Sequence, residues 1–151
     1  EMSYLYNHPK IKSLVSFTHG EGFGRPLLEA TMVDLPVICS NWSGPVDFLS
    51  KDRSILVSGK LDKIPNSAVW DEILIRESSW FTVDEHEAYT ALKYAYENIN
   101  ELKDKAKTLG KENRSKYKQS DMMVLFNEIV SSVAKDVPKP VSLNLPKLKK
   151  I

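Results

Sequence analysis

Two acidic side chains bracket a glycine-rich stretch near the start of the chain. Glu21 and Glu29 are separated by seven residues, and Gly20, Gly22 and Gly24 surround the first of them. A carboxylate accepts two hydrogen bonds at once, which matches the vicinal hydroxyls of a ribose or a hexose. Glycine lets backbone N–H groups approach a ligand, and a helix starting after such a loop offers free amides to a diphosphate. Together these features indicate a nucleotide sugar as ligand.

Two other phosphate-binding motifs are excluded by the spacing. The dinucleotide pattern G-x-G-x-x-G fails because its last position would be Arg25 or Leu27. The acid expected about 20 residues further on in that motif is also absent. A Walker A loop ends in Gly-Lys-Ser/Thr, which this stretch lacks.

The elements around this stretch predict a parallel α/β arrangement. A short apolar run is expected to form a buried strand before the loop, and a helix with Pro26 in its first turn is expected after it. The order strand, loop, helix then recurs, which is typical of α/β units. The expected strands are 13–18, 36–40 and 54–57, and the expected helices are 25–33 and 45–49.

The second half of the chain is expected to be helical after an irregular segment. Residues 58–79 predict no regular element. Asp84 is expected to cap the next helix, with Glu87 completing a capping box. A further helix is expected over 101–117, interrupted at Gly110.

A last helix is expected to begin at Ser120 or Asp121 and to turn an apolar face inward. The residues of that face are Met122, Leu125, Phe126, Ile129, Val130 and Val133. The Pro- and Lys-rich segment 135–151 is expected to be an extended tail. We therefore expect one domain over 1–134, followed by this tail.

Composition favours a globular domain with a core. The 151 residues are 42% hydrophobic and 27% charged, with a net charge of +1. The first 99 residues carry −5 and the remainder +6, but the lysines alternate with acids as on solvated helix faces, so no nucleic acid is expected. No apolar run approaches the ~18–20 residues needed to span a bilayer, no signal peptide is visible, and a cytoplasmic location is expected. The first residue, Glu1, suggests a piece of a longer protein.

Two residues near the second expected strand have competing interpretations. Trp42 lies where ligand crevices of α/β proteins open, and packing is favoured for it over a stacking platform. Cys39 is the only cysteine, which excludes a disulfide framework or a cysteine-based zinc site. It lies in an apolar strand and is interpreted as a buried hydrophobe rather than a nucleophile.

The motif resembles the family four glycosyltransferases, which are retaining enzymes of the GT-B fold. Residues 21–30 read Glu-Gly-Phe-Gly-Arg-Pro-Leu-Leu-Glu-Ala, and Leu-Pro-Val-Ile-Cys-Ser and Ser-Gly-Pro-Val-Asp follow. The resemblance is close over 1–57 and loose over 80–133. It implies the second half of the C-terminal, donor-binding domain, a Rossmann-like half of the fold that lacks its first βα units.

The resemblance implies a role for each residue of the motif. Glu21 would lie against the donor sugar hydroxyls near the reacting carbon, as the catalytic residue, and Glu29 would hold the ribose hydroxyls. Backbone amides would contact the sugar and the diphosphate, and these belong to Gly22, Phe23 and Gly24.

Flanking residues are also candidates for donor binding. Arg25 either contacts a phosphate or pairs with Glu29 at helical spacing. His19 either touches the sugar or its leaving phosphate, or is an ordinary polar loop residue. The family usually has Pro-Ser where this chain has Phe17 and Thr18, and the Thr18 hydroxyl keeps a phosphate contact open.

The expected function is hexosyl transfer from a nucleotide-diphosphate sugar to an unknown acceptor (a glycan, a lipid or a protein). No metal or other cofactor is implied. The expected partner is an upstream domain of the same protein, and a homo-oligomer is left open. As a fragment, the chain is expected to bind donor weakly and to turn nothing over. The alternatives are another GT-B enzyme, such as a sugar-nucleotide epimerase or a phosphorylase, and a non-catalytic interaction module.

Overall fold

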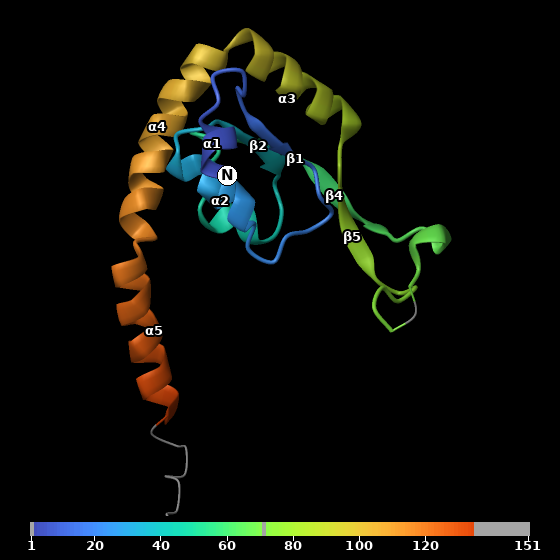
Figure 1. The fold of residues 1–151 in the computed structure, drawn as a ribbon. Coiled ribbons are helices and arrows are strands. Elements are labelled where there is room, and N and C mark those ends of the chain that lie inside the picture. Colours follow the sequence, from blue (N-terminus) through green and yellow to red (C-terminus); the bar gives the residue numbers. More distant parts are fainter. Residues whose placement is uncertain (1, 71, 135–151) are drawn as a thin grey trace, which may run out of the picture. The chain divides into compact units, whose positions relative to one another are not determined.

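A small parallel sheet organises the first part of the chain. The computed structural model describes residues 2–70 and 72–134 and divides the chain into two units, Glu1–Lys116 and Tyr117–Ile151. The sheet contains β1 (Leu14–Ser16), β2 (Val37–Ser40) and β3 (Ile55–Val57) in the order β1-β2-β3. Figure 1 labels β1 and β2 of this sheet. Both pairs are parallel, which confirms the predicted α/β class, although each strand is shorter than expected.

Helices surround this sheet within the first unit. They are α1 (Met2–Tyr6), α2 (Arg25–Met32), α3 (Glu85–Glu97) and α4 (Ile99–Lys116), and the short 3-10 helix η1 (Gly44–Asp47) replaces the helix expected over 45–49. The core joins Ile38 and Val57 of the sheet to Ala95 and Leu102 of α3 and α4. Burial of such apolar side chains is the main stabilising term of the fold.

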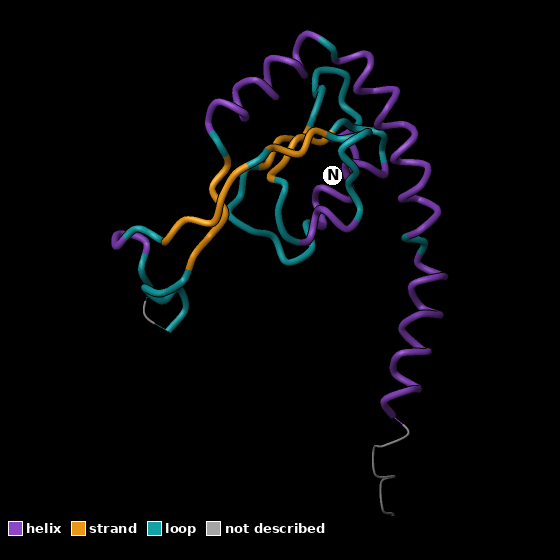
Figure 2. The backbone as a smooth tube through the Cα atoms, turned by 180° about the vertical axis from the view of Figure 1, so that it is seen from behind, coloured by secondary structure: helices purple, strands orange, loops and turns teal. Residues whose placement is uncertain are grey.

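A β-hairpin occupies the segment that the sequence left irregular, so that expectation is wrong. β4 (Gly59–Lys63) pairs antiparallel with β5 (Ser79–Val83), and the 3-10 helix η2 (Asn66–Ala68) lies between them in the chain. Both strands are among the orange segments of the tube in Figure 2. β4 carries a polar, largely exposed sequence, so its pairing depends on backbone hydrogen bonds rather than on apolar alternation. A Cβ on Gly59 would overlap main-chain atoms of Thr82 and Val83, so the close start of the hairpin needs glycine.

The helix predicted to break at Gly110 continues through it. Gly110 is buried in α4, and a Cβ there would overlap the Thr31 carbonyl oxygen and the Asp34 carboxylate. Glycine at this position therefore serves close packing between α4 and α2, not interruption. At the start of α3 the predicted cap is confirmed, because the Asp84 carboxylate accepts the Glu87 N–H at 2.9 Å. The Asp84 N–H donates to the Ser58 carbonyl instead of completing the capping box.

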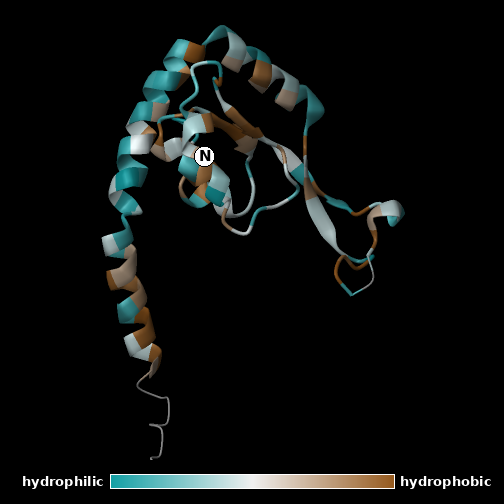
Figure 3. Ribbon diagram, viewed as in Figure 1, coloured by the Kyte–Doolittle hydropathy of each residue, from teal (hydrophilic) through white to brown (hydrophobic). Residues whose placement is uncertain are grey.

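The second unit contains α5 (Gln119–Ala134), which begins one or two residues before the expected cap. Its apolar side chains were expected to face inward, and this is wrong for the described residues, because none of α5 is buried. Figure 3 shows hydrophobic residues along this exposed helix. Among the described helices, none combines the length and apolar character that crossing a membrane requires. The predicted tail, 135–151, lies outside the described residues.

Candidate functional site

The loops that follow β1 and β2 are tied together at the carboxyl ends of the two strands. The Ser43 hydroxyl donates to the Glu21 carbonyl oxygen at 2.7 Å, and the Gly44 N–H donates to the same oxygen at 3.1 Å. The Ser40 hydroxyl donates to the Thr18 carbonyl at 2.9 Å. The carboxyl edge of a parallel sheet is where ligands of α/β proteins bind. The residues predicted for the site lie on the first of these loops and on α2, which follows it.

The glycines of the first loop divide into two kinds. Gly24 has a positive φ of 82°, and a Cβ on it would lie 2.9 Å from Pro45 Cγ, so the fold itself requires glycine there. A Cβ on Gly20 or on Gly22 would meet nothing within 4 Å. The side of the loop at Gly20 and Gly22 is therefore open, and a ligand can reach the backbone from that side.

The start of α2 offers a place for an anion beside the loop. Gly24 precedes the helix without a side-chain cap, and Pro26 lies in the first turn. The Leu27 and Leu28 N–H groups both donate to the Gly24 carbonyl. The dipole of α2 favours negative charge at this end.

Glu29 is paired in this structure. The Arg25 guanidinium donates to its carboxylate at 2.7 Å, so of the two roles predicted for Arg25 the ion pair is the one formed here. The Arg25 side chain is 83% exposed, which makes this a weak surface pair that a ligand can displace.

Glu29 also borders a small hollow between α1 and α2. The hollow measures ≈ 200 Å³, and Ser3, Tyr6, Met32 and Val33 complete its lining. Burial, and then the Glu29 charge, raise the pKa of the Tyr6 phenol. Glu29 thus lies at the edge of a partly apolar recess.

The Glu21 carboxylate has no hydrogen-bond or ion-pair partner within the described part of the chain. Its backbone carbonyl oxygen, in contrast, accepts two hydrogen bonds. The residue is half-buried. A half-buried, unpaired carboxylate between open glycines is available to a hydroxylated ligand.

His19 is held by the hairpin. Its Nδ1 lies 2.7 Å from the Phe81 carbonyl, and its own carbonyl accepts the Phe81 N–H at 3.1 Å. Its ring stacks on Trp80, with centroids 3.9 Å apart and planes 1° from parallel. His19 therefore has a structural role, because it joins the first loop to β5.

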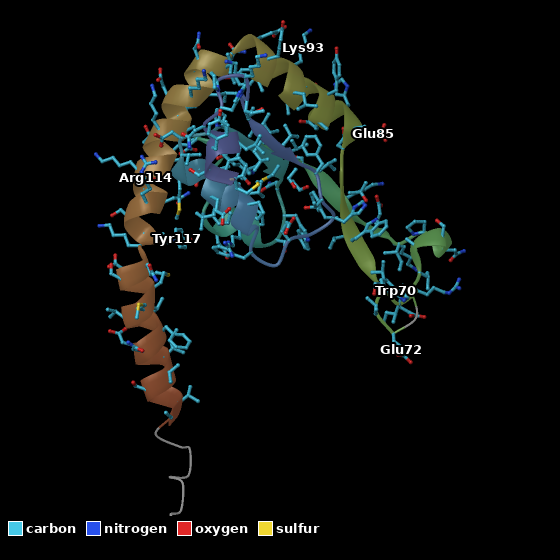
Figure 4. All side chains as sticks on the ribbon, in the orientation of Figure 1. Trp70, Glu72, Glu85, Lys93, Arg114 and Tyr117 are labelled. Atoms are coloured by element: carbon cyan, nitrogen blue, oxygen red, sulfur yellow. The ribbon has the colours of Figure 1, made fainter. Side chains whose placement is uncertain are left out.

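Residues far along the chain position the helix that carries Glu29. Asn113 of α4 donates to the Thr31 hydroxyl at 2.9 Å and to the Phe48 carbonyl at 3.2 Å. Arg114, labelled on α4 in Figure 4, donates to the Met32 carbonyl at 2.6 Å and to Asp34 at 2.7 Å. The sequence carried no signal for these contacts, because they join residues 65 to 82 positions apart.

Ser43 is the residue of the site that sequence reasoning missed. Its backbone has φ 64° and ψ −154°, a region that non-glycine residues almost never adopt. A Cβ on the next residue, Gly44, would overlap Gly22 and Phe23 of the first loop, so the two loops are in close contact. The turn sequence Asn-Trp-Ser-Gly was the available signal, since such turns favour unusual φ values.

Two further observations complete the description of the site. No group of three or more metal-ligating side chains occurs among residues 2–70 and 72–134. Cys39 is buried as predicted, and burial raises the pKa of its thiol to about 12.

Comparison with models of protein families, with curated proteins and with solved structures finds no match to this chain. The interpretation of the site therefore depends on its own geometry and chemistry.

Proposed function

We propose that this chain is part of the donor-binding domain of a retaining glycosyltransferase of the GT-B type. It would bind a nucleotide-diphosphate sugar for hexosyl transfer to an acceptor. One observation carries the proposal: the Glu21 carboxylate, unpaired among the described residues, lies between the open glycines Gly20 and Gly22, in the loop before the uncapped start of α2. The three-stranded parallel sheet with flanking helices supports a Rossmann-like part of such a domain.

Each part of the donor has a matching group at this site. The backbone amides of Gly22, Phe23 and Gly24, which precede α2, would face the diphosphate together with the Thr18 hydroxyl. The Glu29 carboxylate would give up its ion pair with Arg25 and accept hydrogen bonds from the ribose hydroxyls instead. The Arg25 guanidinium would then turn towards the phosphates. Glu21 would accept hydrogen bonds from the hexose.

The chemistry of transfer would be mostly electrostatic. Backbone amides that point at the departing diphosphate stabilise the charge that develops there, and carboxylates fix the sugar in a reactive orientation. We propose no metal. The acceptor would be supplied by an upstream α/β domain of the same protein, so this chain alone is expected to bind donor weakly without turnover. Measurable transfer by the isolated chain would contradict that expectation.

Thermal unfolding in the presence of UDP-glucose or GDP-mannose tests the proposal. A ligand that binds only the folded state raises the midpoint, and the shift grows with ligand concentration. Glu29→Ala is expected to abolish the shift. Glu97→Ala, an acid-to-alanine change on the exposed face of α3, is the matched control and is expected to retain it.

Two results would overturn the proposal. One is the absence of any shift with a panel of nucleotide sugars, and the other is an equal loss of the shift in both variants. Strongly salt-dependent binding of RNA or DNA would favour the interaction module instead.

A further inference from the structure

Trp42 presents an exposed aromatic surface next to the loop that carries Glu21. It follows β2 directly and is 40% exposed, whereas Phe81 of β5, beneath it, is 6% exposed. The two rings are parallel, with centroids 5.5 Å apart. Phe81 therefore covers one face of the indole, and the exposed surface of Trp42 lies away from that face.

The position of Trp42 relative to Glu21 is fixed by its neighbour. Ser43 has the disallowed φ and ψ described above and donates to the Glu21 carbonyl, as does Gly44. Strained backbone persists only where its surroundings determine it, and it occurs preferentially at ligand clamps and active sites.

The aromatic ring and the carboxylate have complementary chemistry. The electron-rich face of an indole attracts groups that carry partial positive charge, and the C–H groups on one face of a pyranose carry such charge. The hydroxyls at the edge of the same pyranose donate to a carboxylate. A hexose therefore has a chemical partner in each of these groups, whereas a diphosphate gains nothing from either.

We propose that Trp42, supported by Phe81, is a stacking platform for the hexose ring of the donor and contributes to sugar specificity. The inference rests on the proposed function, because it assigns a residue to the sugar end of the same site. It also separates the two ends of the ligand: α2 and Glu29 serve the nucleotide end, and Trp42 and Glu21 serve the sugar end.

Calorimetric titration of the full chain tests this separation. It compares the affinity for UDP with that for UDP-glucose, and the affinity for GDP with that for GDP-mannose. Trp42→Ala is expected to weaken binding of the sugar nucleotide about tenfold and to leave the nucleoside diphosphate unchanged. Trp42→Phe keeps an aromatic ring and is expected to retain most of the affinity. Trp70→Ala, on the exposed tip of the hairpin labelled in Figure 4, is the control and should change neither.

The outcomes separate this inference from the proposed function. Equal affinities in Trp42→Ala and the unmodified chain overturn the platform while the function stands, provided that Glu29→Ala still weakens both ligands. Equal weakening of both ligands in Trp42→Ala, with a lowered unfolding midpoint, also overturns it and assigns Trp42 to packing. If the unmodified chain binds neither ligand of either pair, the proposed function fails as well.

Discussion

The Ser43 hydroxyl donates a hydrogen bond to the Glu21 carbonyl oxygen across 2.7 Å, joining the loop after β2 to the loop after β1. The Gly44 N–H donates to the same oxygen, so one carbonyl group binds both Ser43 and Gly44. The backbone of Ser43 is strained, and these two bonds are the contacts that hold it. Through them the position of Glu21 depends on a turn 22 residues away.

Substitutions at Ser43 are expected to separate strain from hydrogen bonding. Ser43→Ala loses the hydroxyl but keeps the unfavourable φ, and is expected to lower the free energy of unfolding by about 1 kcal/mol. Ser43→Gly loses the same bond but relieves the strain, since glycine adopts positive φ readily. The free energy of unfolding, measured in urea, is therefore expected to be about 1 kcal/mol higher for the glycine variant than for the alanine variant. An alanine variant as stable as the glycine variant would show that Ser43 is not strained.

Arg25→Ala is expected to weaken nucleotide binding. In the free chain Arg25 pairs with Glu29, and this exposed pair is worth no more than about 1 kcal/mol. In the proposed complex Arg25 would turn towards the phosphates, so its removal would cost a charge-assisted contact. Titration with UDP at two salt concentrations measures both the affinity and its salt dependence. Tighter binding by Arg25→Ala would show that Arg25 only competes for Glu29.

Gly110→Ala is expected to destabilise the chain although alanine is the better helix former. In an exposed helix this change is worth about 1 kcal/mol in favour of alanine. Here the new methyl group would overlap the Thr31 carbonyl and the Asp34 side chain, so we expect a net loss of about 1–3 kcal/mol.

Gly20→Ala is the matched control for that substitution. Its Cβ would enter open space, and its free energy of unfolding should stay within about 0.5 kcal/mol of the unmodified chain. Similar urea midpoints for the two variants would mean that α2 and α4 do not pack as closely as described.

Local chemistry explains what the sequence allowed us to predict. Glycine and proline spacing around α2, the cap at Asp84 and the short apolar strands all act within a few residues, and each was found close to its expected place. The hairpin was missed because β4 has no apolar alternation, and its partner strand lies some 20 residues further along.

The errors at Gly110 and in α5 have a common physical cause. Glycine in a helix is indistinguishable in sequence from a helix break until its packing partner, here Thr31, is known. An apolar face likewise indicates that a helix is amphipathic, but it does not specify what covers that face. The contacts of Asn113 and Arg114 with α2 could not be predicted for the same reason, since no local pattern encodes a long-range partner.

Cys39 is expected to make stability depend on pH in the alkaline range. Its pKa is raised by burial from 9.0 to about 12, so the unfolded chain loses the proton first as pH increases. The stabilisation is complete below pH 9 and is lost as pH rises from there towards 12, by about 1.4 kcal/mol per pH unit. Cys39→Ala, which lacks the thiol, is the reference. Relative to this variant, the free energy of unfolding of the unmodified chain should fall steadily over this pH range. Parallel curves would contradict the burial of Cys39.

The apolar residues of α5 are expected to contribute little to the stability of the chain by themselves. Phe126 is 65% exposed, whereas Leu102 of α4 is 4% exposed within the core of the first unit. Truncation of a buried leucine costs about 2–5 kcal/mol, while a change at an exposed site usually stays within about 0.5 kcal/mol. Phe126→Ala should therefore leave the urea midpoint of the dilute chain nearly unchanged, and Leu102→Ala should lower it substantially. A large loss in Phe126→Ala that grows with protein concentration would instead show that α5 is covered in a homo-oligomer, because stability gained through association depends on concentration.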